Sequence, residues 1–168
     1  MILIINTTAD TGLTAEIEEK LRAKQAEFEI VEAADMKISH CIGCNVCWLK
    51  TPGVCAVKDD YEIILKKIIK ADQMWVISDT ALGFLNHKGK NIFDRILPIL
   101  DMYLEIRDGQ LCHILRYDKR TDIGVIYKGN GDRDYLNRWN ARCTKNIDSR
   151  ALGAYPANEI EEAVKCMQ

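Results

Sequence analysis

Short apolar runs alternate along the chain with longer stretches whose apolar residues recur at helical spacing. The runs are unbroken and rich in β-branched residues, a pattern typical of strands covered on both faces in a parallel sheet. The periodic stretches, with charged residues between their apolar positions, are typical of amphipathic helices. The predicted strands are residues 2–5, 28–31, 74–77, 123–127 and 150–155. The predicted helices follow them, over residues 13–21, 61–69, 92–100, 135–143 and 160–167.

Local signals mark where some of these helices begin and end. Asp59 stands before the apolar stripe that starts at Tyr61, and Glu62 is placed to form a capping box with it. Pro156 suits the first turn of the last helix, because proline has no N–H to satisfy there. Pro98 is expected to kink or end the third helix.

The alternation of strand and helix predicts an α/β fold with a doubly wound parallel sheet in three α/β/α layers. For this class we expect the strand order 2-1-3-4-5. Residues 36–58, which contain four cysteines, and residues 103–117 break the regular pattern. In the second segment, Asp108-Gly109 separates two alternating runs and predicts a β-hairpin. Because we find no repeat or linker, residues 1–168 are predicted to form a single domain with these two additions.

Charge and hydropathy argue against several classes of partner. The chain has 23 Lys and Arg against 25 Asp and Glu, scattered along its length, whereas nucleic-acid binders usually concentrate basic residues on one face. We therefore expect no nucleic-acid partner. No apolar run approaches the roughly 20 residues of a membrane span, and the first residues do not resemble a signal peptide, so we expect a cytoplasmic protein without membrane contact. Seven cysteines in such a chain indicate reduced thiols, a metal or a cluster rather than a disulfide framework.

Ligands of doubly wound sheets bind at the carboxyl ends of the strands, which here means the loops at residues 6–14, 78–87 and 128–132. The first loop has four threonines and Gly12 at the start of a helix, so its hydroxyls and free backbone N–H groups suit a phosphate. An ordinary capping turn is the alternative interpretation. In the second loop, small and polar residues with Gly83 would let the backbone approach a flat ligand.

The densest chemical signal is a set of four cysteines, Cys41, Cys44, Cys47 and Cys55. The first three share the two-residue spacing of loops that bind a [4Fe-4S] cluster, where successive thiolates reach different irons. Zinc is a second interpretation, although zinc loops usually consist of two separated pairs. The third is a set of reduced thiols packed as small apolar groups. The three histidines are far apart in the sequence with no matching serine or aspartate, so a hydrolytic triad is not supported.

The cysteine segment also carries a family resemblance. Residues 41–55, CIGCNVCWLKTPGVC, with the triplet KDD shortly after them, resemble the cysteine loop of the iron-sulfur flavoprotein branch of the NADPH-dependent FMN reductase family. Residues 83–95, which end in FDR, are similar to that family's second flavin loop and the helix after it. The resemblance implies a flavodoxin-like fold, FMN as cofactor, and oligomers that place flavins near subunit contacts. It also implies a [4Fe-4S] cluster in members with the fullest cysteine set.

On this resemblance we expect an FMN-binding redox flavoprotein, an oxidoreductase similar to NAD(P)H-dependent FMN reductases. It would take electrons from NAD(P)H or another reduced donor and pass them to a small-molecule or protein partner, the chemistry belonging to the cofactor. The residues expected to hold the FMN phosphate are Thr8, Thr11, Gly12 and Thr14. Those expected around the flavin ring are Ser78, Thr80, Gly83 and Phe84, with Asn130 or Gly131 at its far edge. The ligands expected for the cluster are Cys41, Cys44, Cys47 and Cys55.

Departures from the family's pattern motivate a rival hypothesis. The family's phosphate loop usually reads Gly-Ser-x-Arg, whereas residues 7–10 read Thr-Thr-Ala-Asp and have no arginine. The family favours Pro-x-Tyr in the second loop, where residues 79–81 read Asp-Thr-Ala. The rival is a non-catalytic binding or assembly domain that keeps the flavodoxin-like fold and has lost the flavin. Under both hypotheses we expect a homodimer or higher homo-oligomer, with apolar residues of the hairpin at residues 103–117 in the subunit contact.

Overall fold

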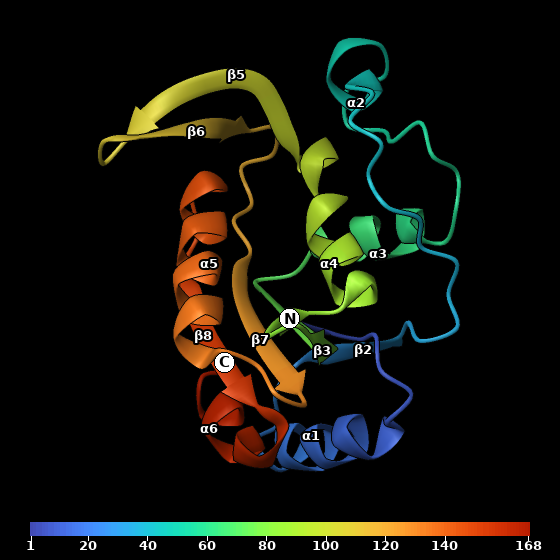
Figure 1. The fold of residues 1–168 in the computed structure, drawn as a ribbon, viewed down its shortest axis with the longest axis vertical. Helices are drawn as coiled ribbons and strands as arrows, with labels where there is room; N and C mark the ends of the chain where they lie inside the picture. Colours follow the sequence, from blue (N-terminus) through green and yellow to red (C-terminus); the bar gives the residue numbers. More distant parts are fainter.

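A central sheet of parallel strands organises the computed structural model, which describes residues 1–168 (Figure 1). The strands are β1 (Ile2–Asn6), β2 (Phe28–Glu32), β3 (Gln73–Ala81), β7 (Asp122–Lys128) and β8 (Ala151–Pro156). Their order in the sheet is β2-β1-β3-β7-β8, and every pairing along it is parallel. Counted without the short strands that lie elsewhere, this is the order 2-1-3-4-5. The predicted doubly wound topology is confirmed.

Helices cover both faces of the sheet and form the outer layers. One face carries α1 (Thr11–Ala23) and α6 (Ile160–Lys165), with the short η2 (Ala157–Glu159) before α6. The other face carries α3 (Tyr61–Ile68), α4 (His87–Asp94) and α5 (Arg133–Asn146). The apolar run of β1 is unbroken because both its faces are covered: Ile2 and Ile4 pack with the first pair of helices, and Leu3 and Ile5 with the second layer.

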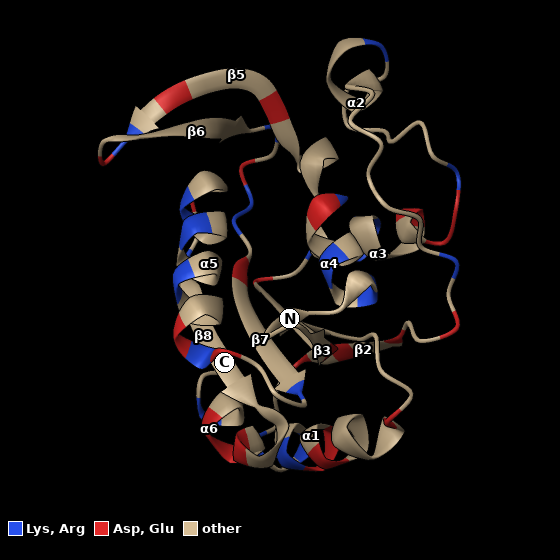
Figure 2. Ribbon diagram, in the orientation of Figure 1, with Lys and Arg blue, Asp and Glu red and all other residues tan.

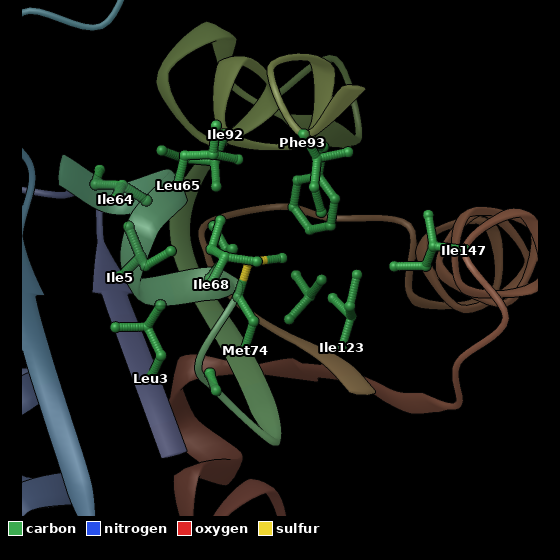
Figure 3. Close-up of a cluster of buried hydrophobic side chains, with 14 of the residues drawn as sticks. Leu3, Ile5, Ile64, Leu65, Ile68, Met74, Ile92, Phe93, Ile123 and Ile147 are labelled. Atoms are coloured by element: carbon green, nitrogen blue, oxygen red, sulfur yellow. The ribbon is translucent and has the colours of Figure 1, made fainter. Parts of the chain in front are cut away.

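The larger core lies between the sheet and the layer of α3, α4 and α5. Figure 3 shows Leu3 and Ile5 of β1 beside Ile64 and Ile68 of α3, with Met74 of β3 next to them. All five side chains are completely buried. Burying one side chain of this size stabilises the fold by about 1.5–3 kcal/mol. This core therefore stabilises the sheet, and the candidate sites lie at one edge of that sheet.

The smaller core, under α1 and α6, depends on a close approach between two neighbouring strands. Trp75 of β3 is completely buried and lies over Gly124 of β7. A Cβ atom at Gly124 would stand 2.3 Å from the indole ring, which no side chain can occupy. Glycine is therefore required there for the tryptophan to fit.

The end of β3 differs from the prediction. The strand continues past the predicted residues and turns back into a short antiparallel strand, β4 (Phe84–Leu85). Part of the loop predicted at residues 78–87 is therefore a tight hairpin. Its turn residues Leu82 and Gly83 both have positive φ, 53° and 79°.

α4 begins earlier than predicted and ends before the proline. The side chain of Asn86 accepts a hydrogen bond from the backbone N–H of Gly89 at 3.1 Å, which caps the helix in front of its first predicted residue. Pro98 lies four residues beyond the last residue of α4, in the following turn, η1 (Leu97–Ile99), so it does not kink the helix.

The capping box predicted at the start of α3 is wrong. The carboxylate of Glu62 pairs with Lys66 at 2.8 Å along the helix instead of returning to Asp59. One oxygen of Asp59 does accept from the backbone N–H of Tyr61 at 3.2 Å, but both oxygens also accept from a buried arginine described below.

Both segments that break the pattern are excursions from the sheet. The predicted hairpin is confirmed as β5 (Leu100–Arg107) and β6 (Gln110–Leu115), joined at Asp108 and Gly109, and it arches over one end of α5 (Figure 1). Arg107 holds it there through a hydrogen bond to the carbonyl oxygen of Lys145 at 2.7 Å. The cysteine segment contains α2 (Val46–Leu49), whose Trp48 packs on His113 of the hairpin with ring centroids 4.8 Å apart.

No helix of this structure combines the length and the apolar character needed to cross a membrane.

Candidate functional site

The structure brings the four cysteines of the excursion together. Cys41, Cys44, Cys47 and Cys55 all line one small cavity, which has about 20 Å³ of free space. Burial raises the pKa of the Cys47 thiol, and the neighbouring sulfurs of the other three cysteines raise it further. Ionising one of these thiols therefore disfavours ionising the next. A positive partner is needed if all four are to serve as thiolate ligands.

The spacing of these thiols distinguishes between a single ion and a cluster. Tetrahedral zinc requires four ligands at about 2.0–2.3 Å from one point. In this structure no three His, Cys, Asp or Glu side chains stand at the spacing of a single metal ion. Four sulfurs around a common cavity correspond better to a [4Fe-4S] cube, in which each thiolate binds a different iron. The four cysteines line one cavity as cluster ligands would, but in this conformation that cavity, with about 20 Å³ of free space, is too small to hold a cluster.

The cysteine segment carries little charge and is attached to the body of the domain through α2. The backbone reverses at Asn45, whose φ is 54°, just before α2. The indole N–H of Trp48 donates to the carbonyl oxygen of Leu97 at 2.9 Å, which attaches α2 to η1. Between residues 38 and 57 the sequence has one charged residue, Lys50, and Figure 2 shows this stretch almost entirely uncoloured by charge. No charged side chain lines the small cavity itself.

A buried ion pair ties the two ends of this segment to the body of the domain. Arg95, just after α4, donates to Asp59 with a shortest distance of 2.8 Å, and each side chain is 1% exposed. The same guanidinium donates to the carbonyl oxygens of Ser39 at 2.9 Å and Val57 at 3.3 Å. Ser39 precedes the first cysteine and Val57 follows the last. Arg95 therefore holds the segment closed around the cavity.

Arg95 also places a buried guanidinium beside the last of the four cysteines. Burial opposes its charge, but Asp59 and the sulfur of Cys55 raise the pKa of the guanidinium. Burial alone would likewise raise the pKa of Asp59, yet the hydrogen bonds from Arg95 and the backbone of Ser39 hold it below its usual range. The Nε atom of Arg95 is buried and has no hydrogen-bond partner within the chain. A buried donor left over beside Cys55 suits a thiolate or cluster sulfur as its acceptor.

The predicted phosphate loop lies at the carboxyl edge, but its polar groups are engaged within the chain. The hydroxyl of Thr8 donates to Asn6 at 2.8 Å, and that of Thr14 donates to Glu32 at 2.5 Å. The first residues of α1, Thr11 and Gly12, are exposed. The backbone N–H of Gly12 donates to the Asp10 carboxylate at 3.1 Å.

Asp10 takes the position that an anion would take at the start of α1. Its second oxygen pairs with Lys128 of β7 at 2.6 Å, and this contact is the main reason that its pKa lies below the usual range. A helix N-terminus favours one negative group, and here the chain supplies that group itself. In this conformation the edge does not fit an FMN phosphate, because the carboxylate would repel it.

Three of the residues predicted around a flavin ring lie at one place, where they are engaged by backbone groups of the third loop. Thr80 donates to the carbonyl oxygen of Lys128 at 3.3 Å, and the carbonyl oxygen of Gly83 accepts from the backbone N–H of Asp132 at 2.8 Å. Gly83 also forms a backbone bridge with Gly131, which joins the second and third loops.

The remaining predicted ring residues have different surroundings. Ser78 is buried, and its hydroxyl contacts the carbonyl oxygen of Asp79 at 2.8 Å. Phe84 packs edge-on against Trp139 of α5 with centroids 4.9 Å apart, so it contacts the protein rather than an open face. Asn130 is exposed and makes no side-chain hydrogen bond within the chain. The structure therefore gathers Thr80, Gly83 and Gly131 at one place and leaves the others apart.

Arg95 is the functional residue that sequence reasoning missed. It belongs to the stretch of residues 83–95 that carries the family resemblance, so a signal was present, but no role followed from it. Its partner Asp59 lies 36 positions away, and the sequence around Asp59 resembled a helix cap. Long-range pairing of this kind leaves no periodic mark in a sequence.

Two curated proteins match part of the chain, and no family model matches it. An iron-sulfur flavoprotein of Methanocaldococcus jannaschii is 34% identical over 89 residues, which is 53% of this chain and 45% of that protein. An iron-sulfur flavoprotein of Archaeoglobus fulgidus is 35% identical over 79 residues, which is 47% of this chain and 38% of that protein. The matched region is thus less than half of each relative. The predicted resemblance to iron-sulfur flavoproteins is confirmed over this part of the chain.

Solved structures with low sequence identity share the fold. A flavone reductase aligns with a TM-score of 0.60 at 15% identity, covering 98% of this chain and 59% of that one. An NAD(P)H:quinone oxidoreductase from Methanothermobacter marburgensis aligns with a TM-score of 0.59 at 10% identity, covering 99% and 94%. The two-electron reduced flavodoxin of Megasphaera elsdenii aligns with a TM-score of 0.53 at 14% identity, covering 98% of each chain. The fold is flavodoxin-like.

Proposed function

We propose that the chain is an electron-transfer protein whose four cysteines hold a [4Fe-4S] cluster. The observation that carries the proposal is the convergence of Cys41, Cys44, Cys47 and Cys55 on one cavity beside the buried charge of Arg95. A bound cluster supplies one-electron storage. The chain supplies the four ligands, a cavity without charged lining residues, and a buried guanidinium beside Cys55.

The proposal includes FMN as the flavin, with NAD(P)H or another reduced carrier as donor and a small molecule or protein as acceptor. The names of the two curated relatives support the flavin. For a phosphate to reach the start of α1, the contact between Asp10 and Lys128 must open. Lys128 is then free to face the phosphate, and it supplies a positive charge that the loop itself lacks.

The contact between Asp10 and Lys128 also favours the second candidate function, a binding or assembly domain without a flavin. In that function the contact between Asp10 and Lys128 stays closed while the protein acts, and no phosphate binds at the start of α1. Titration with FMN separates the two candidates. A red shift or quenching of flavin emission with half-saturation below about 100 µM supports the flavoprotein, and no binding up to that limit, which corresponds to about 5.5 kcal/mol, supports the rival.

The cluster is tested by anaerobic preparation with analysis of iron, acid-labile sulfide and zinc. We expect about four irons per chain in the wild type and in the control Cys166→Ser, whose cysteine lies outside the cavity. Cys44→Ser should lose most of the iron, and because Cys44 is exposed the substitution should leave the fold intact. Near-zero iron in all three proteins would mean that these thiols are structural.

We further propose that the protein is a homodimer or higher homo-oligomer that uses the hairpin of β5 and β6. Met102, Leu104, Ile106 and Leu111 are exposed on it, and a two-stranded ribbon is marginally stable alone. Light scattering at tens of micromolar protein should give at least twice the chain's mass. A monomer mass would contradict this part of the proposal, and Ile106→Lys should shift an oligomer toward monomer.

A further inference from the structure

A second cavity lies on the other side of the cysteine segment. It has a volume of about 330 Å³ and is bounded by α4, α5, the start of β7 and the segment itself. It shares three lining residues, Cys41, Gly43 and Leu97, with the small cavity that the four cysteines line. The two cavities are thus separated by a wall of a few residues. Nothing in the proposed function uses the larger one.

The size and walls of this cavity suit a small apolar ligand. Its volume is at the lower end of the range for small-molecule sites, and nine of its twelve lining residues are hydrophobic. Phe93 and Ile147 point toward the same space as Ile123 in Figure 3, and all three line the cavity. Phe93 meets Trp139 edge to face with centroids 4.6 Å apart. Aromatic edges and branched side chains together favour a flat ring.

The lining of the cavity offers a ligand no uncompensated charge. The only charged lining residue is Asp94, and its carboxylate pairs with Lys90 one turn earlier on α4. The thiol of Cys143 also lines the cavity, and burial raises its pKa to about 11, so it stays neutral at pH 7. The lining therefore favours a neutral ligand over FMN with its charged phosphate.

One polar group in the wall is oriented and has donors to spare. The side-chain oxygen of Asn146 accepts a hydrogen bond from the backbone N–H of His113 at 3.0 Å, which fixes the amide. Its Nδ2 group makes no hydrogen bond within the chain, and Asn146 lines the cavity. A carbonyl oxygen on the ligand would be the matching acceptor.

We propose that this cavity binds a neutral, flat ring of the quinone class, whose carbonyl oxygen accepts a hydrogen bond from Nδ2 of Asn146. The apolar walls hold the ring and the amide sets its orientation. The proposal that the ring binds depends only on the residues that line the cavity. Use of the bound ring as an electron acceptor rests on the cluster proposed above, whose ligand Cys41 stands in the shared wall.

The test measures binding to iron-free protein, so that it does not depend on the cluster. The probe is 2,3-dimethyl-1,4-naphthoquinone, because methyl groups at both ring positions prevent addition of the free thiols. The comparison ligand is 2,3-dimethylnaphthalene, which has the same shape without carbonyl oxygens. Equilibrium dialysis gives both dissociation constants, and quenching of tryptophan emission reports on Trp139 in the wall.

Asn146→Asp is the decisive variant, because it keeps the acceptor for His113 and removes the donor. We expect it to weaken quinone binding about tenfold and to leave the hydrocarbon within about twofold. Asn137→Asp is the matched control. Asn137 lies on the same helix and also accepts from a backbone N–H, that of Ala154 at 2.9 Å, but it does not line the cavity. The control should bind both ligands like the wild type.

Cys143→Phe fills the cavity from α5 and provides a second test that does not use the amide. We expect it to abolish binding of both ligands, with thermal unfolding used to confirm that the variant is folded. Quinone binding that survives both Asn146→Asp and Cys143→Phe unchanged would overturn the proposal, as would a wild type that binds no quinone up to its solubility limit. Either failure leaves the iron analysis untouched, so the two proposals fail separately.

Discussion

Replacing Arg95 with methionine should reveal how the cysteine segment is held. The variant keeps most of the side-chain volume but removes the charge and every donor. It leaves the Asp59 carboxylate, now 1% exposed, without its partner. It also removes the donors to the carbonyl oxygens of Ser39 and Val57, which flank the cysteines.

The magnitude follows from burial and geometry. Breaking a buried ion pair by removing one partner costs about 3–5 kcal/mol, because the remaining charge is left uncompensated. Asp59 keeps hydrogen bonds from the backbone N–H groups of Ser39 at 2.9 Å and Tyr61 at 3.2 Å, which places the expected cost toward the lower end. For a domain of this size, about 3 kcal/mol corresponds to a fall in Tm of roughly 6–12 °C. Adding Asp59→Asn to Arg95→Met should recover part of the loss, since the stranded charge disappears.

Urea unfolding followed by tryptophan emission measures the free energy of unfolding for each variant. Arg133→Met is the control, because Arg133 pairs with Glu159 at the surface, where such pairs contribute about 0–1 kcal/mol. A loss at Arg95 no larger than at Arg133 would refute the reasoning.

The dependence on pH gives an independent check. The pKa of Asp59 is lowered in the folded state, so its contribution is present above the unfolded pKa of about 3.9 and is lost as pH falls through the folded value. In Arg95→Met, burial without the guanidinium raises the pKa of this carboxyl, so the variant takes up a proton at a higher pH than the wild type does. The stability difference should therefore begin to narrow above about pH 4 and go on narrowing as the pH falls through the lowered pKa of the wild type. A difference that stays constant down to pH 3 would show that the carboxylate's charge is not involved.

Two further predictions concern the carboxyl edge and the sheet. Asp10→Asn keeps the cap on α1 and removes the charge that would repel a phosphate, so fluorescence titration should show FMN binding about tenfold more tightly. The control is Asp72→Asn, whose carboxylate pairs with Lys119. Equal tightening of FMN binding in the control would mean a non-specific charge effect. Gly124→Ala places a Cβ 2.3 Å from Trp75 and should lower the free energy of unfolding in urea by about 1–3 kcal/mol or more, with a shift in Trp75 emission. An unchanged urea midpoint would contradict the close packing of Trp75 on Gly124.

Sequence reasoning recovered the architecture because its determinants are local or repeated. The apolar run at residues 2–5 and its counterparts report burial on both faces, and that condition defines the sheet. Asp108-Gly109 specifies the hairpin turn through two positive φ angles, 46° and 75°. The cysteine spacing placed four sulfurs in one short segment, and the short chain between them left few ways to keep them apart.

What sequence reasoning missed depends on long-range contacts or on unusual turns. The turn after β3 is made by Leu82, a residue that rarely adopts positive φ, so nothing marked a hairpin there. Phe84 was expected beside a flavin, but its ring packs edge-on against Trp139, which lies 55 positions further along the chain. Lys128 and Asp10 approach only because β1 and β7 flank β3 in the sheet.

The measurement that tests the account most directly is low-temperature electron paramagnetic resonance of the anaerobically reconstituted protein after reduction with dithionite. We expect a spin-one-half signal of a reduced [4Fe-4S] cluster, integrating to about one spin per four irons, in the wild type. In Cys44→Ser, which alters one of the four residues around the cavity, the signal should be lost or strongly reduced. A wild type that holds iron but gives no such signal, or the same signal in both proteins, would contradict the assignment of these cysteines.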